Sequence, residues 1–238
     1  MKAILLLLMI ALNCEARDLV WSDEFDGTQL DQTKWTIVED KRREATNCKE
    51  AITVSDGYLH INTFTKDDRH YTGMINTEGK FEAAYGYWEM RVKFDDQSGT
   101  WSDAWLYSHD VAHKVGDLDK IGMEIDIFEH RKYDSNRKDI SGLVNHALHW
   151  DGYGDQHKNV ATDSPIKEGF NIFGLEWSKD KYQFFINGIK VWEASPVTSK
   201  PLHLIFSTEV QYELGWTQPL LKEYKHETMT VDWIRFYH

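Results

Sequence analysis

Short segments rich in aromatic and β-branched residues recur along the whole chain, and this pattern most constrains the fold. Segments such as YLHINTFT (58–65), GYWEMRVKF (86–94) and MTVDWIRFY (229–237) alternate apolar and polar side chains. This two-residue period is typical of a strand with one buried face. No stretch longer than about ten residues keeps the helical period. The pattern therefore predicts an all-β protein, a sandwich or jelly roll built from many short strands.

One hairpin can be assigned from its turn. The segment KYQFFINGIKVWEA (181–194) reads as two strands around Asn187-Gly188. Asn-Gly is the pair preferred in tight type I′ turns, because both central residues of such a turn have positive φ.

The chain length allows one large all-β domain or two small ones. There are 238 residues and four prolines, with no low-complexity run that would indicate a linker. Residues 1–16 (MKAILLLLMIALNCEA) carry a single lysine and an apolar run, then end in small and polar residues. We predict a secretory signal peptide at residues 1–16 and one folded domain at residues 17–238.

The signal has two alternatives. Residues 1–16 could be a buried first strand or helix, or a lipoprotein signal ending at Cys14, although Asn13 is a poor residue before a lipidated cysteine. The apolar run is too short to span a membrane. We therefore expect a secreted or periplasmic protein without membrane insertion, and we expect a monomer.

The net charge limits the binding partners the protein can have, and the cysteine content limits how the fold is stabilised. The formal net charge is −12, which disfavours nucleic acids and anionic membranes. Removal of residues 1–16 leaves Cys48 alone, so stability must come from packing and not from a disulfide. Two local basic runs, KRR (42–44) and HRKYDSNRK (130–138), could form positive patches on this acidic protein.

The aromatic content points to a sugar ligand. The ten tryptophans mostly serve packing, but Trp101, Asp103 and Trp105 alternate on one face of a single expected strand. We expect one of these two tryptophans to be exposed in a groove. Flat rings there suit the apolar faces of sugar rings, while carboxylates and amides bind the hydroxyl groups.

The segment EIDIFEH (124–130) carries the chemistry. Glu124 and Asp126 share one face of a strand, but Glu129 lies five residues after Glu124, an odd spacing. A β-bulge between Asp126 and Glu129 would bring all three acids to one face. Two carboxyl groups on one surface can cleave a glycosidic bond. A solvent-facing strand with Glu129 starting a loop, or a metal site, would also explain the three acids.

Several motifs together resemble glycoside hydrolase family 16. EIDIFE is similar to the E-x-D-x-x-E signature in the bulged form of the laminarinase and galactanase branch. The resemblance covers nearly the whole chain after residue 16. It is carried by LVWSDEFDG, GKFEAAYGYWEMRVKF, GTWSDAWLYS, NHALHWDGYG, GFNIFGLEWSKDKYQFFINGIKVWE and VDWIRFYH, in this order. The chain departs from the family where Pro-Ala-Phe is common and Ser102, Asp103 and Ala104 stand here.

The resemblance implies a concanavalin A-like β-jelly-roll sandwich of two curved antiparallel sheets with a concave cleft. It implies endo-acting hydrolysis of β-glucans or β-galactans with retention. Glu124 falls at the nucleophile, Asp126 at the assisting acid and Glu129 at the acid/base.

The resemblance also suggests how substrate is bound. His149 falls at a strand position facing the catalytic acids, and Trp101 and Trp105 fall at sugar-stacking positions. Further candidates for sugar contacts are Asn145, Glu209 and, at the rim, Trp216.

The resemblance implies no cofactor for catalysis, but a structural calcium ion on the convex side. Its ligand positions match the backbone at Glu24 and Gly57 and the side chain of Asp232. Oxygen ligands from separate loops suit calcium. Alternatively, Asp232 is an ordinary carboxylate of an edge strand.

We therefore expect a secreted endo-glycosidase acting on a polysaccharide, with β-1,3- or mixed-linkage β-glucan first. An endo-β-galactanase acting on agar, porphyran or mucin-type galactan is the alternative. A transglycosylase on the same scaffold is disfavoured by the extra residue in the acid motif. A lectin-like module that binds without cutting is disfavoured because all three acids are intact.

Overall fold

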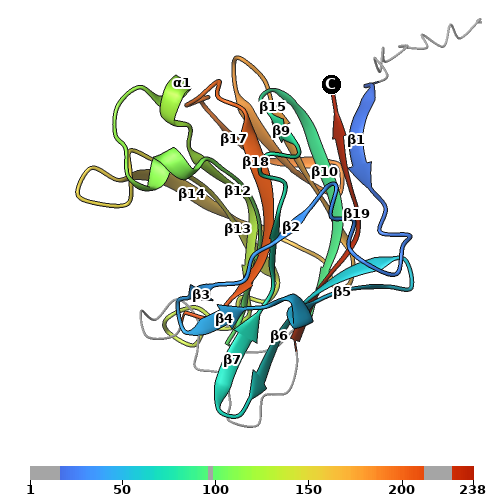
Figure 1. Ribbon diagram of the computed structural model, residues 1–238. Helices are drawn as coiled ribbons and strands as arrows, with labels where there is room; N and C mark the ends of the chain where they lie inside the picture. Colours follow the sequence, from blue (N-terminus) through green and yellow to red (C-terminus); the bar gives the residue numbers. More distant parts are fainter. Residues whose placement is uncertain (1–16, 96–98, 212–226) are drawn as a thin grey trace, which may run out of the picture.

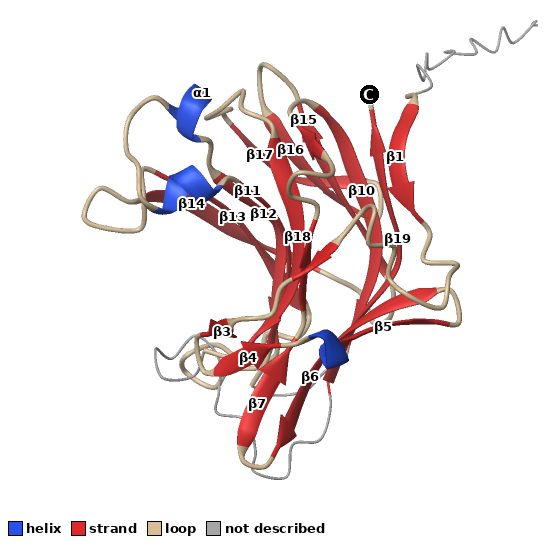
Figure 2. Ribbon diagram, viewed as in Figure 1, coloured by secondary structure: helices blue, strands red, loops and turns tan. Residues whose placement is uncertain are grey.

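The protein is a sandwich of two sheets in a computed structural model that describes residues 17–95, 99–211 and 227–238 (Figure 1). Strands make up nearly all of its regular structure, and the helical segments are single short turns (Figure 2). These turns are η1 (Lys49–Ala51), η2 (His109–Ala112) and α1 (Leu118–Ile121). Within the described ranges no helix has the length and apolar character needed to cross a membrane.

The larger sheet has eleven strands among the described residues. Its main path runs β17-β16-β15-β10-β19-β6-β7-β4-β3, while β1 pairs with β19 and β5 with β6. The strands are β1 (Leu19–Asp23), β3 (Lys41–Arg42), β4 (Ala45–Asn47), β5 (Ile52–Ser55), β6 (Tyr58–Lys66), β7 (Arg69–Thr72), β10 (Gly86–Phe94), β15 (Asn171–Trp177), β16 (Tyr182–Ile186), β17 (Ile189–Ala194) and β19 (Glu227–Tyr237).

The smaller sheet, eight strands in the described part of the chain, carries the cleft described below. It runs β14-β13-β12-β11-β18-β8-β2, and β9 pairs with β18. The strands are β2 (Thr36–Ile37), β8 (Met74–Asn76), β9 (Glu82–Ala83), β11 (Trp101–Tyr107), β12 (Glu124–Arg131), β13 (Leu143–Trp150), β14 (Lys158–Pro165) and β18 (Leu202–Glu209).

The expected all-β jelly-roll sandwich is confirmed. Pairing is antiparallel except between β4 and β7, which run parallel. The expected hairpin is also present: β16 and β17 flank Asn187 and Gly188, whose φ angles of 52° and 78° are those of a type I′ turn.

The apolar core fills the space between the sheets. Strand β10 shows why, because Trp88, Met90 and Val92 alternate with polar residues and are buried. Across the interface Phe128 of β12 meets Phe173 of β15 with ring centroids 4.4 Å apart. Burial of such side chains is the main term that holds the two sheets together.

Strand β12 contains the expected bulge. Its register with β13 shifts between Asp126 and Glu129, and its register with β11 passes from Asp126 to Phe128, so Ile127 has no partner there. Ile127 and Phe128 are consecutive, yet both belong to the buried core. The extra residue is absorbed on the core side, which returns Glu129 to the opposite face.

Candidate active site

A cleft of about 1200 Å³ runs over the outer face of the smaller sheet. Its floor comes from β11, β12, β13, β14 and β18, which lie side by side in Figure 1. One wall comes from the segment around β3, which includes Arg42 and Arg43. Strands β11, β12, β13 and β18 pair with a neighbour on each side, so two ladders hold the side chains they present, whereas β14 is the edge strand.

Glu124, Asp126 and Glu129 all line this cleft, together with Trp101 and Trp105. The bulge expected from the odd spacing is therefore confirmed, and so is the common face. Ile125, which lies between the first two acids, faces the core and is fully buried. A regular strand would have placed Glu129 in that core, where a charge costs several kcal/mol or more.

Glu129 and Asp126 lie in surroundings that favour their protonated forms, because both pKa values are raised. Burial raises the pKa of Glu129 well above its usual value, and the neighbouring Asp126 and Glu124 raise it further. Burial likewise raises the pKa of Asp126, with Glu124 and Glu209 adding to the effect. A carboxyl group with a raised pKa can deliver a proton near neutral pH.

Glu124 is held closer to its ionised form. Burial raises its pKa, but His149, a hydrogen bond from Tyr153 and the charge of Arg42 oppose that rise. The Tyr153 hydroxyl donates directly to Oε2 of Glu124. The pKa of Glu129 is therefore raised well above its usual value, whereas the rise at Glu124 is opposed by His149, Tyr153 and Arg42.

Tyr153 could not be found from the strand pattern. It belongs to the connection between β13 and β14, inside the NHALHWDGYG motif. Loop residues have no period that indicates their direction, so only the folded chain shows that this phenol reaches Glu124.

His149 lies where the family resemblance placed it, facing the acids. It is paired in register with Glu124, and its Nε2 lies 3.3 Å from Oδ2 of Asp126. Its Nδ1 lies 3.0 Å from Nε2 of His157, and the two rings stack. These contacts hold the imidazole against the acid pair.

Trp101 and Trp105 line the cleft, but the expectation that one of them is exposed is wrong. They are only 9% and 7% exposed. The guanidinium of Arg43 lies 4.8 Å from the Trp101 ring centre, and that of Arg42 lies 5.7 Å from the Trp105 ring centre. The basic run at 42–44 therefore covers the rings.

Glu209 holds the two arginines at the wall of the cleft by pairing with both of them. Nε of Arg42 donates to Oε1 of Glu209 over 2.8 Å, and Nε of Arg43 donates to Oε2. Glu209 was a candidate sugar ligand on sequence grounds, but both of its oxygens already accept from arginine. It lines the cleft as the anchor of the arginine wall.

Asp103 is a fourth acid of the cleft. It faces Glu129 across the β11–β12 ladder and is 3% exposed. Burial, Glu129 and Glu209 raise its pKa well above the usual value, in that order. Its Oδ2 accepts a hydrogen bond of 3.3 Å from Ser207. The alternation with Trp101 and Trp105 indicated its face, but not its closeness to Glu129.

Of the two other residues expected to contact sugar, the structure places one in the cleft. Asn145 lines the cleft opposite Glu129, and its Nδ2 donates to Oδ1 of Asp163 over 2.9 Å. Trp216 lies outside the described residues.

The expected calcium positions lie on or beside strands of the larger sheet. Glu24 follows β1 and Gly57 precedes β6, and both strands pair with β19 on either side of Asp232. The side chains are already engaged, because Asp232 pairs with Arg91 and the Glu24 carboxylate accepts from Arg235.

Known proteins resemble this chain over most of its length. The Beta-glucanase of Rhodothermus marinus is 25% identical over 246 residues, covering 92% of this chain and 85% of that protein. Beta-porphyranase E of Zobellia galactanivorans is 26% identical over 245 residues, covering 91% of this chain and 85% of that protein. Glucan endo-1,3-beta-glucosidase A1 of Niallia circulans is 25% identical over 72% of this chain, which spans 28% of that longer protein.

The fold agrees with these relatives. The catalytic domain of an endo-1,3-beta-glucanase (laminarinase) from Thermotoga petrophila RKU-1 superposes with a TM-score of 0.75 and 25% identity, covering 94% of this chain and 98% of that domain. A family model described as Beta-porphyranase A-D, GH16 domain, matches residues 18–238. The match spans almost the whole chain, so this protein is a glycoside hydrolase and belongs to glycoside hydrolase family 16.

Proposed function

We propose that the protein hydrolyses internal β-linkages of a polysaccharide with retention, with Glu124 as nucleophile and Glu129 as acid/base. One observation carries this assignment. The two acids share a cleft and burial raises the pKa of both, yet His149, Tyr153 and Arg42 oppose the rise at Glu124, whereas Asp126 and Glu124 add to the rise at Glu129.

Two displacements complete the reaction. In the first, the Glu124 carboxylate bonds to the anomeric carbon while the Glu129 proton goes to the departing glycosidic oxygen. In the second, Glu129 takes a proton from water, whose oxygen bonds to the anomeric carbon and releases Glu124. Each displacement inverts the centre, so the product keeps its original configuration.

Asp126 supports the nucleophile in this scheme. It lies between the two glutamates on the cleft face, and its raised pKa keeps a proton available. A protonated Asp126 can donate to Glu124 and stabilise its charge when the glycosyl ester breaks. The chain supplies both proton transfer and nucleophile, so we propose no cofactor for catalysis.

The substrate is a β-glucan or a β-galactan. Relatives named as a β-glucanase and a glucan endo-1,3-β-glucosidase support β-1,3- or mixed-linkage glucan. The porphyranase domain model, Beta-porphyranase E and a relative named Keratan-sulfate endo-1,4-beta-galactosidase support a galactan. An open cleft of about 1200 Å³ suits internal segments of either polymer.

A panel of laminarin, mixed-linkage β-glucan, agarose and porphyran separates these classes. New reducing ends should appear with one polymer class, as a ladder of oligosaccharides typical of internal cleavage. Release of one small sugar from the chain end would contradict the endo-acting proposal.

The residue roles are tested by Glu124→Gln and Glu129→Gln. Each should lose at least about a thousandfold in kcat, because each change removes an essential step of the reaction. Both variants should keep the wild-type melting temperature, since the side chains are nearly isosteric. Proton NMR of the first product should show the substrate's own anomeric configuration. An inverted first anomer would rule out Glu124 as nucleophile.

We further propose a calcium ion at the convergence of Glu24, Gly57 and Asp232. The strand pairings described above support this place. An ion there would compete with Arg91 for the Asp232 carboxylate.

Secretion and monomeric state are also proposals, and they rest on the sequence of residues 1–16 and on the acidic surface charge. The mature protein recovered from the medium or periplasm should begin at Arg17. Lipid attached to Cys14 would replace this proposal with membrane anchoring. Light scattering should give the mass of one chain.

A further inference from the structure

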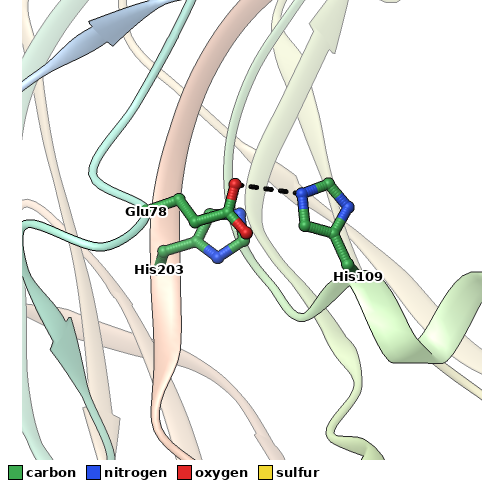
Figure 3. Close-up of side chains that lie close together, drawn as sticks. All are labelled: Glu78, His109 and His203. Atoms are coloured by element: carbon green, nitrogen blue, oxygen red, sulfur yellow. Dashed lines mark hydrogen bonds and ion pairs between the residues drawn. The ribbon is translucent and has the colours of Figure 1, made fainter.

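A cluster of two histidines and one glutamate lies at the edge of the cleft, apart from the catalytic acids. Glu78 follows β8, His109 begins η2, and His203 lies in β18. One ligand atom from each side chain lies within 4.8 Å of the other two. The three side chains converge on one point (Figure 3).

The strand ladders hold this cluster together. Tyr107, the last residue of β11, pairs with His203 in β18, which places the start of η2 beside that histidine. Thr77 holds the turn that carries Glu78 to the same strand. Its N–H donates to the carbonyl of Leu204 over 3.0 Å, and its hydroxyl accepts from the Leu204 N–H over 3.0 Å.

One side chain of the cluster, His203, is buried, and the other two are exposed to solvent. His203 is 4% exposed, and no described residue makes a hydrogen bond to its ring nitrogens. His203 also lines the cleft, so its ring can take a ligand from that side. His109 and Glu78 are largely exposed, with Nε2 and Oε2 3.0 Å apart, so an ion can enter from solvent.

We propose that Glu78, His109 and His203 form a binding site for a zinc-class divalent cation. Two imidazole nitrogens and one carboxylate oxygen are the donors that zinc takes at about 2.0–2.2 Å. The ligand atoms already lie within 4.8 Å of one another, and Glu78 and His109 are exposed, so their side chains are free to rotate toward a shared ion. Calcium and magnesium prefer oxygen donors alone, so they do not suit this set.

The ion would join three separate elements at the cleft wall. His109 and His203 also line the cleft, so a fourth coordination position faces its solvent. Binding would hold the β8–β9 turn to η2 and β18, and it would stabilise the folded state by mass action. The proposal does not depend on the proposed catalytic roles, because its readout is metal binding.

Zinc titration of the metal-stripped full protein tests this site. His109→Ala and Glu78→Gln change exposed side chains, so both variants should fold. Each should bind one zinc ion fewer than the wild type in calorimetry, and each should lose the zinc-dependent rise in melting temperature. His113→Ala, which removes a histidine of the same connection that lies outside the cluster, should behave as the wild type.

A second zinc ion could bind Glu124, Asp126 and His149, whose ligand atoms also lie within 4.8 Å of one another. His149→Ala serves as the control for that position and should leave the Glu78 cluster occupied. Cobalt absorption of tetrahedral type should be lost in His109→Ala and kept in His149→Ala. The proposal is overturned if His109→Ala and the wild type bind equal zinc, or if only His149→Ala loses it.

Discussion

At the scale of the residue, Tyr153 connects the cleft to the pH dependence of the reaction. Its hydroxyl donates to Glu124 and holds down the pKa of that carboxyl group, against the rise caused by burial. As the proposed nucleophile, Glu124 would act only when ionised, so kcat/KM should fall as the pH drops below this pKa.

Tyr153→Phe removes that hydrogen bond. The pKa of Glu124 should rise, and the acidic limb of the kcat/KM profile should move to higher pH. The alkaline limb, which the proposed acid Glu129 would set, should move less. Tyr58→Phe, on the larger sheet, should leave the profile unchanged. An unmoved acidic limb in Tyr153→Phe would show that the phenol does not set the charge of Glu124.

At the scale of the element, backbone conformation is adjusted where side chains require it. In β12 one residue is left without a partner in the ladder, at a cost of about 0.5–1.5 kcal/mol for a hydrogen bond. Burial of an ionised Glu129 would cost several kcal/mol or more. The bulge costs less than burial of the charge, so the strand bulges and the Glu129 carboxyl group stays in the cleft.

The β16–β17 hairpin allows a direct measurement of backbone strain. Gly188 has φ of 78°, and no atom lies within 4 Å of the position that an added Cβ would take, so Gly188→Ala adds strain without a clash. The left-handed conformation costs an L-residue about 1–2 kcal/mol. For a chain of this size each ~1 kcal/mol lowers Tm by about 2–4 °C.

Gly142→Ala is the matched control, because this glycine also has open space but no positive φ. Differential scanning calorimetry should show a lower Tm for Gly188→Ala alone. Equal Tm values for the two variants would mean that the turn relaxes without cost.

At the scale of the whole molecule, the sandwich is held by packing. Within the described residues Cys48 is a free thiol, and the shared core spans both sheets. A metal ion bound only by the folded state would add to this stability.

The calcium proposal predicts that calcium raises the Tm of metal-stripped protein and that chelation lowers it again. Asp232→Asn should weaken this response, because it removes the charged ligand. His109→Ala should keep the full calcium response, which separates this site from the zinc cluster. If calcium does not change the Tm, the calcium proposal is wrong and Asp232 serves as the ion-pair partner of Arg91.

Properties that depend on neighbours in the chain could be predicted from the sequence. Alternation along β10, β11 and β19 determines which side chains face the core, since successive strand residues point to opposite faces. The odd spacing of Glu129 required a bulge for the same reason. The Asn187-Gly188 pair determined its turn, because local φ preferences do not need the rest of the protein.

Contacts between distant segments were decided only by the tertiary structure. Arg42 and Arg43 cover Trp105 and Trp101 because the β3 segment folds over the cleft. Glu78, His109 and His203 come from three separate parts of the chain, and the β11–β18 and β8–β18 ladders together with the Thr77 hydrogen bonds bring them together. A strand period specifies a face but not the segment that lies opposite, and that segment determines burial, charge and ligands.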